Sequence, residues 1–128
     1  MEARKRTDQP LTLGQQLREA RLRAGLKPKE LARKAKLSLA AVYNCERCDR
    51  GGRVRTLILL AKALGLRLRI PDLKGICDRR GLTAAKIALM TDLAFDTVRS
   101  LLARPDGGNV RSLEIFANAL GERVMVVI

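Results

Sequence analysis

The stretch "KELARKAKLSLAAVYNCERC", Lys29 to Cys48, decides how this chain folds. Within it, the short segment "AKLS" separates two stretches that each have the composition of a helix of a few turns. Lysines and arginines surround both. The stretch ends in a Cys-x-x-Cys pair, Cys45 and Cys48, so it raises a metal or redox site as an alternative to a helix whose exposed face binds something else.

The chain contains an internal repeat, which is its most informative pattern. A shift of 56 residues aligns Leu17–Ile70 with Leu73–Val126 without a gap. The matched positions are glycines and apolar residues, a combination that is hard to obtain by chance. They include Gly25 with Gly81, Gly51-Gly52 with Gly107-Gly108, Val54-Arg55 with Val110-Arg111, and Ala63–Gly65 with Ala119–Gly121. The sequence therefore predicts two copies of one small module.

Each copy has the pattern of helices followed by one strand. The first helix opens with a capping box, Thr12 to Gln15, and has an apolar stripe at Leu13, Leu17, Ala20 and Ala24. Further helices are expected at Pro28 to Ala35, from an N-cap at Ser38 to Arg47, and at Val54–Leu64 and Val110–Leu120. Glycines suited to left-handed helix ends follow at Gly25, Gly65, Gly81 and Gly121.

The predicted fold class is all-α, with two tandem helical bundles that each end in a short strand. In the first strand Arg67 and Arg69 alternate with apolar neighbours, and the second strand is expected near the C-terminus. Pairing of the two strands as an antiparallel ribbon would make the chain a pseudo-dimer. The expected division is a basic disordered arm at 1–10, a first module at 11–71 and a second module at 72–128.

Composition restricts the partner. The net charge of +13 favours nucleic acid or an anionic membrane. Only three residues are aromatic, which counts against single-strand and RNA binding and leaves duplex DNA. No apolar run approaches the roughly 20 residues that span a bilayer. With an odd cysteine count and an N-terminus unlike a secretion signal, we expect a protein of the reducing cytoplasm that has no membrane contact.

A set of residues in the first copy identifies a family resemblance. The set is Gly25-Leu26, Glu30-Leu31-Ala32, Ala35, Leu37-Ser38, Val42, Glu46-Arg47 and Leu64-Gly65. It resembles the lambda-repressor-like (Xre/Cro) helix-turn-helix domain, and the terminal strand is similar to that of antitoxin-type members that dimerise through it. The resemblance implies a compact helical bundle, duplex-DNA binding, transcription regulation, and a bacterial or phage cytosol with nucleoid association. The sequence departs from the family where Pro28 and Lys29 replace a usual Gln, and where Lys36 and Asp92 replace a usual Gly.

The third helix of the first copy is the one expected to enter the major groove. By spacing, Val42 and Cys45 fall on its buried side. On the opposite side Asn44 can pair with adenine, and Arg47 with guanine or phosphate. The alternative for these residues is an ordinary solvated helix face. The DNA-binding candidates are Lys27, Lys29, Lys36, Ser38, Ala40, Tyr43, Asn44, Arg47, Arg53 and Arg55.

The second copy has lost most of the positive charge. Residues 1–72 carry a net charge of +11 and residues 73–128 carry +2. Because counterion release from phosphates drives nucleic-acid affinity, the first copy should dominate DNA binding. The second copy is then either a weaker DNA-binding module or a surface for a protein. Its candidate residues are Phe95, Asp96, Arg99 and Arg104.

Two functions fit these patterns. The first is a sequence-specific transcriptional regulator of the repressor type, which contacts double-stranded DNA through the third helix of the first copy. The second is a protein-interaction regulator, an antiactivator or antitoxin, whose residues 73–128 bind another protein. Further homodimerisation of the pseudo-dimer stays open in both.

No enzyme activity, cofactor or metal is predicted. Cys45, Cys48 and Cys77, in a chain without His, cannot complete a four-ligand zinc site. A thioredoxin-like strand-to-helix turn is missing, and no nucleophile has a plausible base. Because Cys45 aligns with the apolar Leu101, we expect it to be a small buried hydrophobic residue, and Cys77 likewise.

Overall fold

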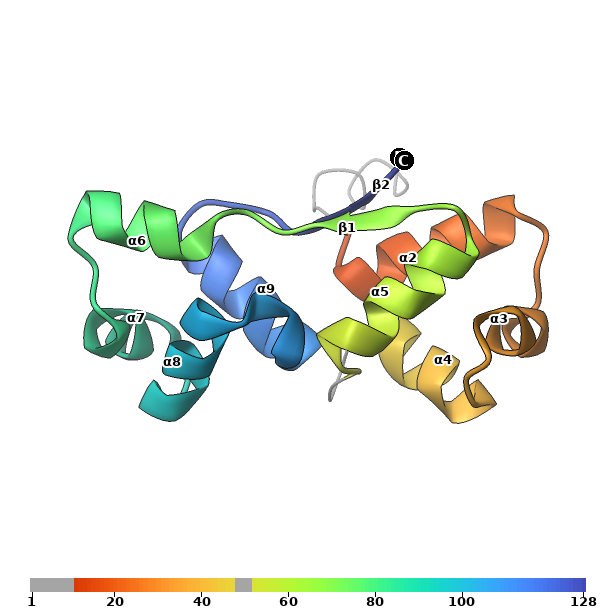
Figure 1. The fold of residues 1–128 in the computed structure, drawn as a ribbon, viewed down its shortest axis with the longest axis horizontal. Coiled ribbons are helices and arrows are strands. Elements are labelled where there is room, and N and C mark those ends of the chain that lie inside the picture. The colour runs from red at the N-terminus through yellow and green to blue at the C-terminus, as the bar shows by residue number, and fades with distance from the viewer. Residues whose placement is uncertain (1–10, 48–51) are drawn as a thin grey trace, which may run out of the picture.

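The computed structural model describes residues 11–47 and 52–128 (Figure 1). The helices and strands are α2 (Leu13–Arg23), α3 (Pro28–Ala35), α4 (Leu39–Arg47), α5 (Val54–Ala63), β1 (Arg67–Arg69), α6 (Leu73–Arg80), α7 (Ala84–Thr91), α8 (Phe95–Ala103), the 3-10 helix η1 (Pro105–Gly107), α9 (Val110–Ala119) and β2 (Met125–Val127). The predicted all-α class is confirmed, with one small antiparallel sheet. The arm at 1–10, together with Cys48 and Gly51, lies outside the described residues.

The helices recur at the spacing of the sequence repeat. α7, α8 and α9 begin and end 56 residues after α3, α4 and α5. The left-handed residues recur in the same way: Gly25 with Gly81, Lys36 with Asp92, and Gly65 with Gly121. In Figure 1, α2 to α5 form one lobe and α6 to α9 form the other, with α5 packed against α9 between them.

Two antiparallel pairings join residues that are 56 positions apart, and they define an approximate internal two-fold axis. In the ribbon of β1 and β2, Arg69 pairs with Met125. Near the starts of α5 and α9, Arg53 pairs with Asn109. The hydrogen bonds of this second pairing, here called the bridge, are Val54 N to Gly108 O and Val110 N to Gly52 O, both 2.9 Å. A residue that pairs with its own equivalent lies on the axis, so the axis runs from the ribbon to the bridge.

The ribbon follows the predicted strand pattern. Arg67 and Arg69 are exposed while Leu68 between them is half-buried. The register that pairs Arg69 with Met125 would place Pro71 opposite Arg123. Proline has no N–H to donate, which explains why the ladder stops on that side of the axis.

The two halves share one hydrophobic core. The buried residues of α2, α4, α5, α6, α8 and α9 form a single cluster, and Val124 beside β2 belongs to it. Polar contacts also cross between the halves: Gln16 Oε1 accepts from Val126 N at 2.8 Å, and Glu114 Oε2 accepts from Leu13 N at 2.8 Å. The C-terminal strand is thereby fixed to the first helix.

The prediction for the apolar stripe of the first helix was wrong in part. Leu13 and Leu17 are fully buried, but Ala20 is only half-buried and Ala24 is exposed. The next buried position of α2 is Arg21, with 5% of its surface exposed. A charged residue can take a core position only with a partner, and Arg21 has one on α4.

Candidate nucleic-acid interface

The turn between α3 and α4 contains a residue that has the left-handed backbone conformation but is not glycine. Lys36 has φ 60°, and its neighbour Leu37 donates its N–H to Ala32 O at 2.9 Å. Leu37 then packs against the core. Ser38 Oγ accepts from Ala41 N at 3.1 Å, which confirms its predicted capping of α4. Turn and cap together fix the direction in which α4 leaves α3.

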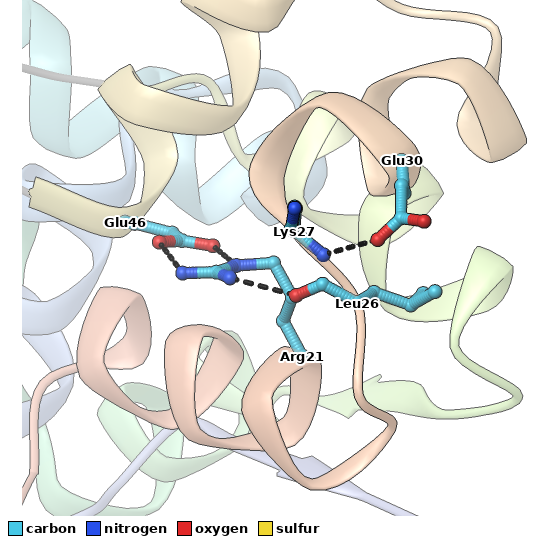
Figure 2. A network of polar contacts seen from close by, with 5 residues as sticks. All are labelled: Arg21, Leu26, Lys27, Glu30 and Glu46. Atoms are coloured by element: carbon cyan, nitrogen blue, oxygen red, sulfur yellow. Dashed lines mark hydrogen bonds and ion pairs between the residues drawn. The ribbon is translucent and has the colours of Figure 1, made fainter.

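A buried ion pair anchors α4 on α2, as Figure 2 shows. Arg21 Nε lies 2.6 Å from Glu46 Oε2, and Arg21 Nη2 donates to Glu46 Oε1 at 3.1 Å. Both side chains are 7% exposed. The hydrogen bond to Glu46 raises the pKa of Arg21, so the guanidinium stays charged in this site. A two-pronged contact of this kind restricts both the position and the rotation of α4.

The same arginine also fixes the start of α3. Arg21 Nη1 donates to Leu26 O at 2.8 Å, and at the next residue Glu30 Oε1 accepts from Lys27 N at 2.7 Å (Figure 2). Pro28 occupies the first turn of α3, where its fixed φ suits a helix start. Helices α2, α3 and α4 are thus joined through one polar network.

The exposed side of α4 is the side that the sequence predicts. Val42 and Cys45 are fully buried. The residues Ala40, Tyr43, Asn44 and Arg47 are all exposed. The side chains available for base contact therefore stand on a helix that is held from behind by packing and by the Arg21–Glu46 pair. The contact with DNA itself stays a prediction.

The basic candidates lie in two places. Lys27, Lys29 and Lys36 are exposed at the two ends of α3. Arg53 and Arg55 are exposed at the start of α5 and line a cleft between the halves. The lining residues of this cleft are Arg53, Arg55, Thr56, Leu59, Ser100, Ala103, Arg104, Asp106 and Gly107. The structure thus brings Arg104 of the second half beside two arginines of the first, which sequence spacing alone does not indicate.

In the second half the same scaffold carries a different surface. The positions of Arg21 and Glu46 hold Cys77 and Leu102, so an apolar pair replaces the ion pair. The methyl group of Ala94, at the N-cap of α8, cannot accept the hydrogen bond that Ser38 accepts. Arg99 lies 4.0 Å from Asp96 and 5.8 Å above the ring of Phe95.

Exposed apolar side chains gather on α7 and at the start of α8. Leu89 is 85% exposed, Met90 53% and Phe95 48%. In the first half the positions of Leu89 and Met90 hold Arg33 and Lys34. Two positive charges of the first half are thereby replaced by apolar side chains on this part of the surface.

The described cysteines serve packing. Cys45 is 0% exposed, and Cys77 is 2% exposed. Burial raises the pKa of the Cys77 thiol, which keeps it protonated. Within residues 11–47 and 52–128, no three His, Cys, Asp or Glu side chains are grouped so that they could hold a metal ion. Over the same residues no helix combines the length and apolarity that crossing a membrane requires.

The Arg21–Glu46 pair is the functional feature that residue-by-residue prediction missed. When the two copies are aligned, Cys77 and Leu102 stand at the two positions. Because many other charges also differ between the copies, this joint replacement does not by itself identify the contact.

Comparison with known proteins agrees with this geometry for the first half. Residues 12–69 match a family model described as a helix-turn-helix domain. Neither the curated proteins nor the solved structures gave a match. The matched segment comprises α2 to β1, with the α3–α4 turn and the exposed face of α4 at its centre. Residues 12–69 are therefore similar to a helix-turn-helix domain in sequence, as the α3–α4 arrangement is in structure.

Proposed function

We propose that this chain is a sequence-specific transcriptional regulator, acting as a repressor, that contacts the DNA major groove with α4. We further propose that residues 11–71 are an Xre/Cro-type domain and that residues 72–128 are its diverged second copy. The place of action would be the cytosol, on the nucleoid of a bacterium or on phage DNA.

The exposed face of α4 carries this proposal. Asn44 can hydrogen-bond an adenine in bidentate fashion, and Arg47 can do so with a guanine. Tyr43, which is exposed on the same helix, offers a hydroxyl for a phosphate. The lysines at the ends of α3 would add phosphate contacts, which position the helix without specifying sequence.

Selection of duplexes from a random pool, followed by binding assays with variants of the full chain, tests the proposal. Asn44→Ala should weaken the selected duplex by about 5-fold to 150-fold and relax the preference at one base pair. Asn118→Ala, an exposed asparagine at the ribbon end of α9, is the matched control and should leave binding unchanged. Equal losses for both variants, or unaltered preference in Asn44→Ala, would contradict the role given to α4.

Salt dependence separates phosphate contacts from base contacts. Each phosphate contact that is lost should reduce the slope of log affinity against log salt by roughly 0.9. Lys29→Ala and Lys36→Ala should reduce that slope while the selected sequence stays the same. A changed sequence preference in either variant would place these lysines among the base contacts.

A second candidate function rests on the exposed apolar side chains of α7. Leu89 and Met90 suit contact with another protein, as an antiactivator or antitoxin would make. Affinity capture with the full chain should retain a partner that the variant Leu89→Arg, Met90→Lys loses, since that variant has the residues of the first half. Leu22→Arg, at a 55% exposed leucine of α2, is the control. Capture that is equal with all three proteins would remove this candidate.

A further inference from the structure

The exposed faces of α4 and α8 differ at every position, although the helices share one scaffold. Beneath them, Val42 and Val98 are identical, and Cys45 and Leu101 are both apolar and buried. The exposed equivalents are Leu39 with Phe95, Ala40 with Asp96, Tyr43 with Arg99, Asn44 with Ser100, and Arg47 with Ala103. The side chains that would contact bases have therefore diverged, while the positions beneath the helix stay apolar and buried.

Both helices lie at the bridge end of the internal axis. The loop glycines at the bridge pack directly on them: a Cβ at Gly52 would lie 2.8 Å from Cys45 Cα of α4, and one at Gly108 would lie 2.5 Å from Leu101 Cδ2 of α8. In Figure 1, α4 and α8 occupy the lower edge of the molecule, and the ribbon occupies the upper edge. A two-fold axis perpendicular to a duplex would thus present both helices to the same side of the DNA.

The cleft between the halves supplies positive charge at the axis. Arg53 lies in the bridge itself, and Arg55 and Arg104 line the same cleft. Duplex DNA bound by α4 and α8 would pass its backbone across this point. Three guanidinium groups suit the phosphates that lie between two contacted grooves.

We propose that the chain binds one continuous operator whose two halves differ in sequence, and that it binds in a single orientation. This inference rests on the DNA binding proposed above. α4 contacts one half-site through Asn44 and Arg47, which favour adenine and guanine. α8 contacts the other through Asp96, which accepts from cytosine, and Arg99, which donates to guanine. A homodimer must contact two equal half-sites, whereas one chain with two unlike helices has no such constraint.

Selection from a random pool with the full chain, compared with a graft variant, tests this inference. The wild type should select one motif with two unlike half-sites centred about 10 base pairs apart. The graft variant gives α8 the exposed residues of α4 through five substitutions: Phe95→Leu, Asp96→Ala, Arg99→Tyr, Ser100→Asn and Ala103→Arg. It should select an inverted repeat of the α4 half-site and bind that repeat about 10-fold or more tightly than the wild type does.

The reverse graft in α4 is the matched control. This variant should select an inverted repeat of the α8 half-site. Its five substitutions are Leu39→Phe, Ala40→Asp, Tyr43→Arg, Asn44→Ser and Arg47→Ala. All ten substituted positions are exposed, so both grafts should unfold within a few degrees of the wild type, which thermal melting checks.

The outcomes separate this inference from the proposed function. A palindromic motif or a lone half-site selected by the wild type would overturn the unlike-halves operator while leaving DNA binding intact. So would a folded α8 graft that selects the wild-type motif. If the wild type enriches no sequence at all, sequence-specific DNA binding fails, and the inference fails with it.

Discussion

Removing one partner of the buried Arg21–Glu46 pair should strongly lower the stability of the fold, whereas replacing both residues together should change it little. Arg21 donates two hydrogen bonds to the Glu46 carboxylate, at 2.6 and 3.1 Å, and the two side chains are each 7% exposed. Glu46→Leu leaves the guanidinium buried, with the contact to Leu26 O as its remaining described hydrogen bond. Removing one partner of a buried pair costs about 3–5 kcal/mol, which is a large part of the 5–15 kcal/mol that stabilises a typical domain.

The second half shows which replacement the scaffold accepts. At the equivalent positions it holds Cys77 and Leu102, which are buried and half-buried. The double variant Arg21→Cys, Glu46→Leu removes both charges and leaves neither unpaired. We expect its free energy of unfolding to lie within about 1 kcal/mol of the wild type, or above it, because apolar replacement of a buried pair is often neutral or stabilising.

Urea denaturation followed by far-ultraviolet circular dichroism, under reducing conditions, measures the complete double-mutant cycle. The coupling energy should be several kcal/mol, with each single variant much less stable than the double variant. Additive losses, in which the double variant is as unstable as the two single variants summed, would refute the conclusion that the pair acts as a unit. A cost below about 1 kcal/mol for Glu46→Leu would refute the expectation that the Arg21 guanidinium stays buried without its partner.

Five further variants, in three comparisons, test other parts of the fold. Gly52→Ala should lower the free energy of unfolding by about 1–3 kcal/mol, since the new Cβ would lie 2.8 Å from Cys45 Cα. Gly108→Ala should lower it less, because its Cβ would meet a leucine methyl that can move. Denaturant unfolding of both variants shows which loss is larger. Lys36→Gly should raise the free energy of unfolding by about 1 kcal/mol, because glycine adopts a left-handed φ of 60° without strain. Asp92→Gly should raise it less, because Asp tolerates that region better than Lys does. The urea midpoints of the two variants measure the difference. Burial raises the pKa of Glu114, so the folded protein loses stability as pH rises through that pKa and the carboxyl group ionises. Glu114→Gln has no such group, so its melting temperature minus that of the wild type should increase from pH 4 to pH 7. A difference that stays constant over this range would contradict the reasoning.

Local signals predicted the first half of the fold closely. Pro28 placed the start of α3, and Ser38 placed the start of α4, because N-caps and helix-start prolines act within one turn. The same reasoning failed at Ala24, which is exposed. The stripe of α2 continues instead through Arg21, whose burial depends on Glu46 from a distant helix. A pattern of apolar spacing contains no information about a charge that is neutralised by tertiary contact.

The repeat predicted the ribbon but not the cleft. A short strand expected at the end of each repeat indicated that the two strands pair, and Arg69 does pair with Met125, its equivalent 56 residues later. The grouping of Arg53, Arg55 and Arg104 arises only when the bridge brings the ends of α8 and α5 together across the axis. Whether these arginines contact DNA stays a prediction, as it does for Asn44 and Arg47.

The low net charge of the second half does not prevent α8 from contacting DNA. If α4 holds one half-site as proposed, a shared core and a paired ribbon, not a free linker, would present α8 to the neighbouring groove. Its effective concentration at that groove would be in the millimolar range or above, so contacts that are weak alone can raise overall affinity by a factor of roughly 10² or more. Under that linkage, residues such as Asp96 and Arg99 need to contribute selectivity more than affinity. The low net charge of the second half would suit this role, since phosphate attraction that ignores sequence would mask the difference between right and wrong half-sites.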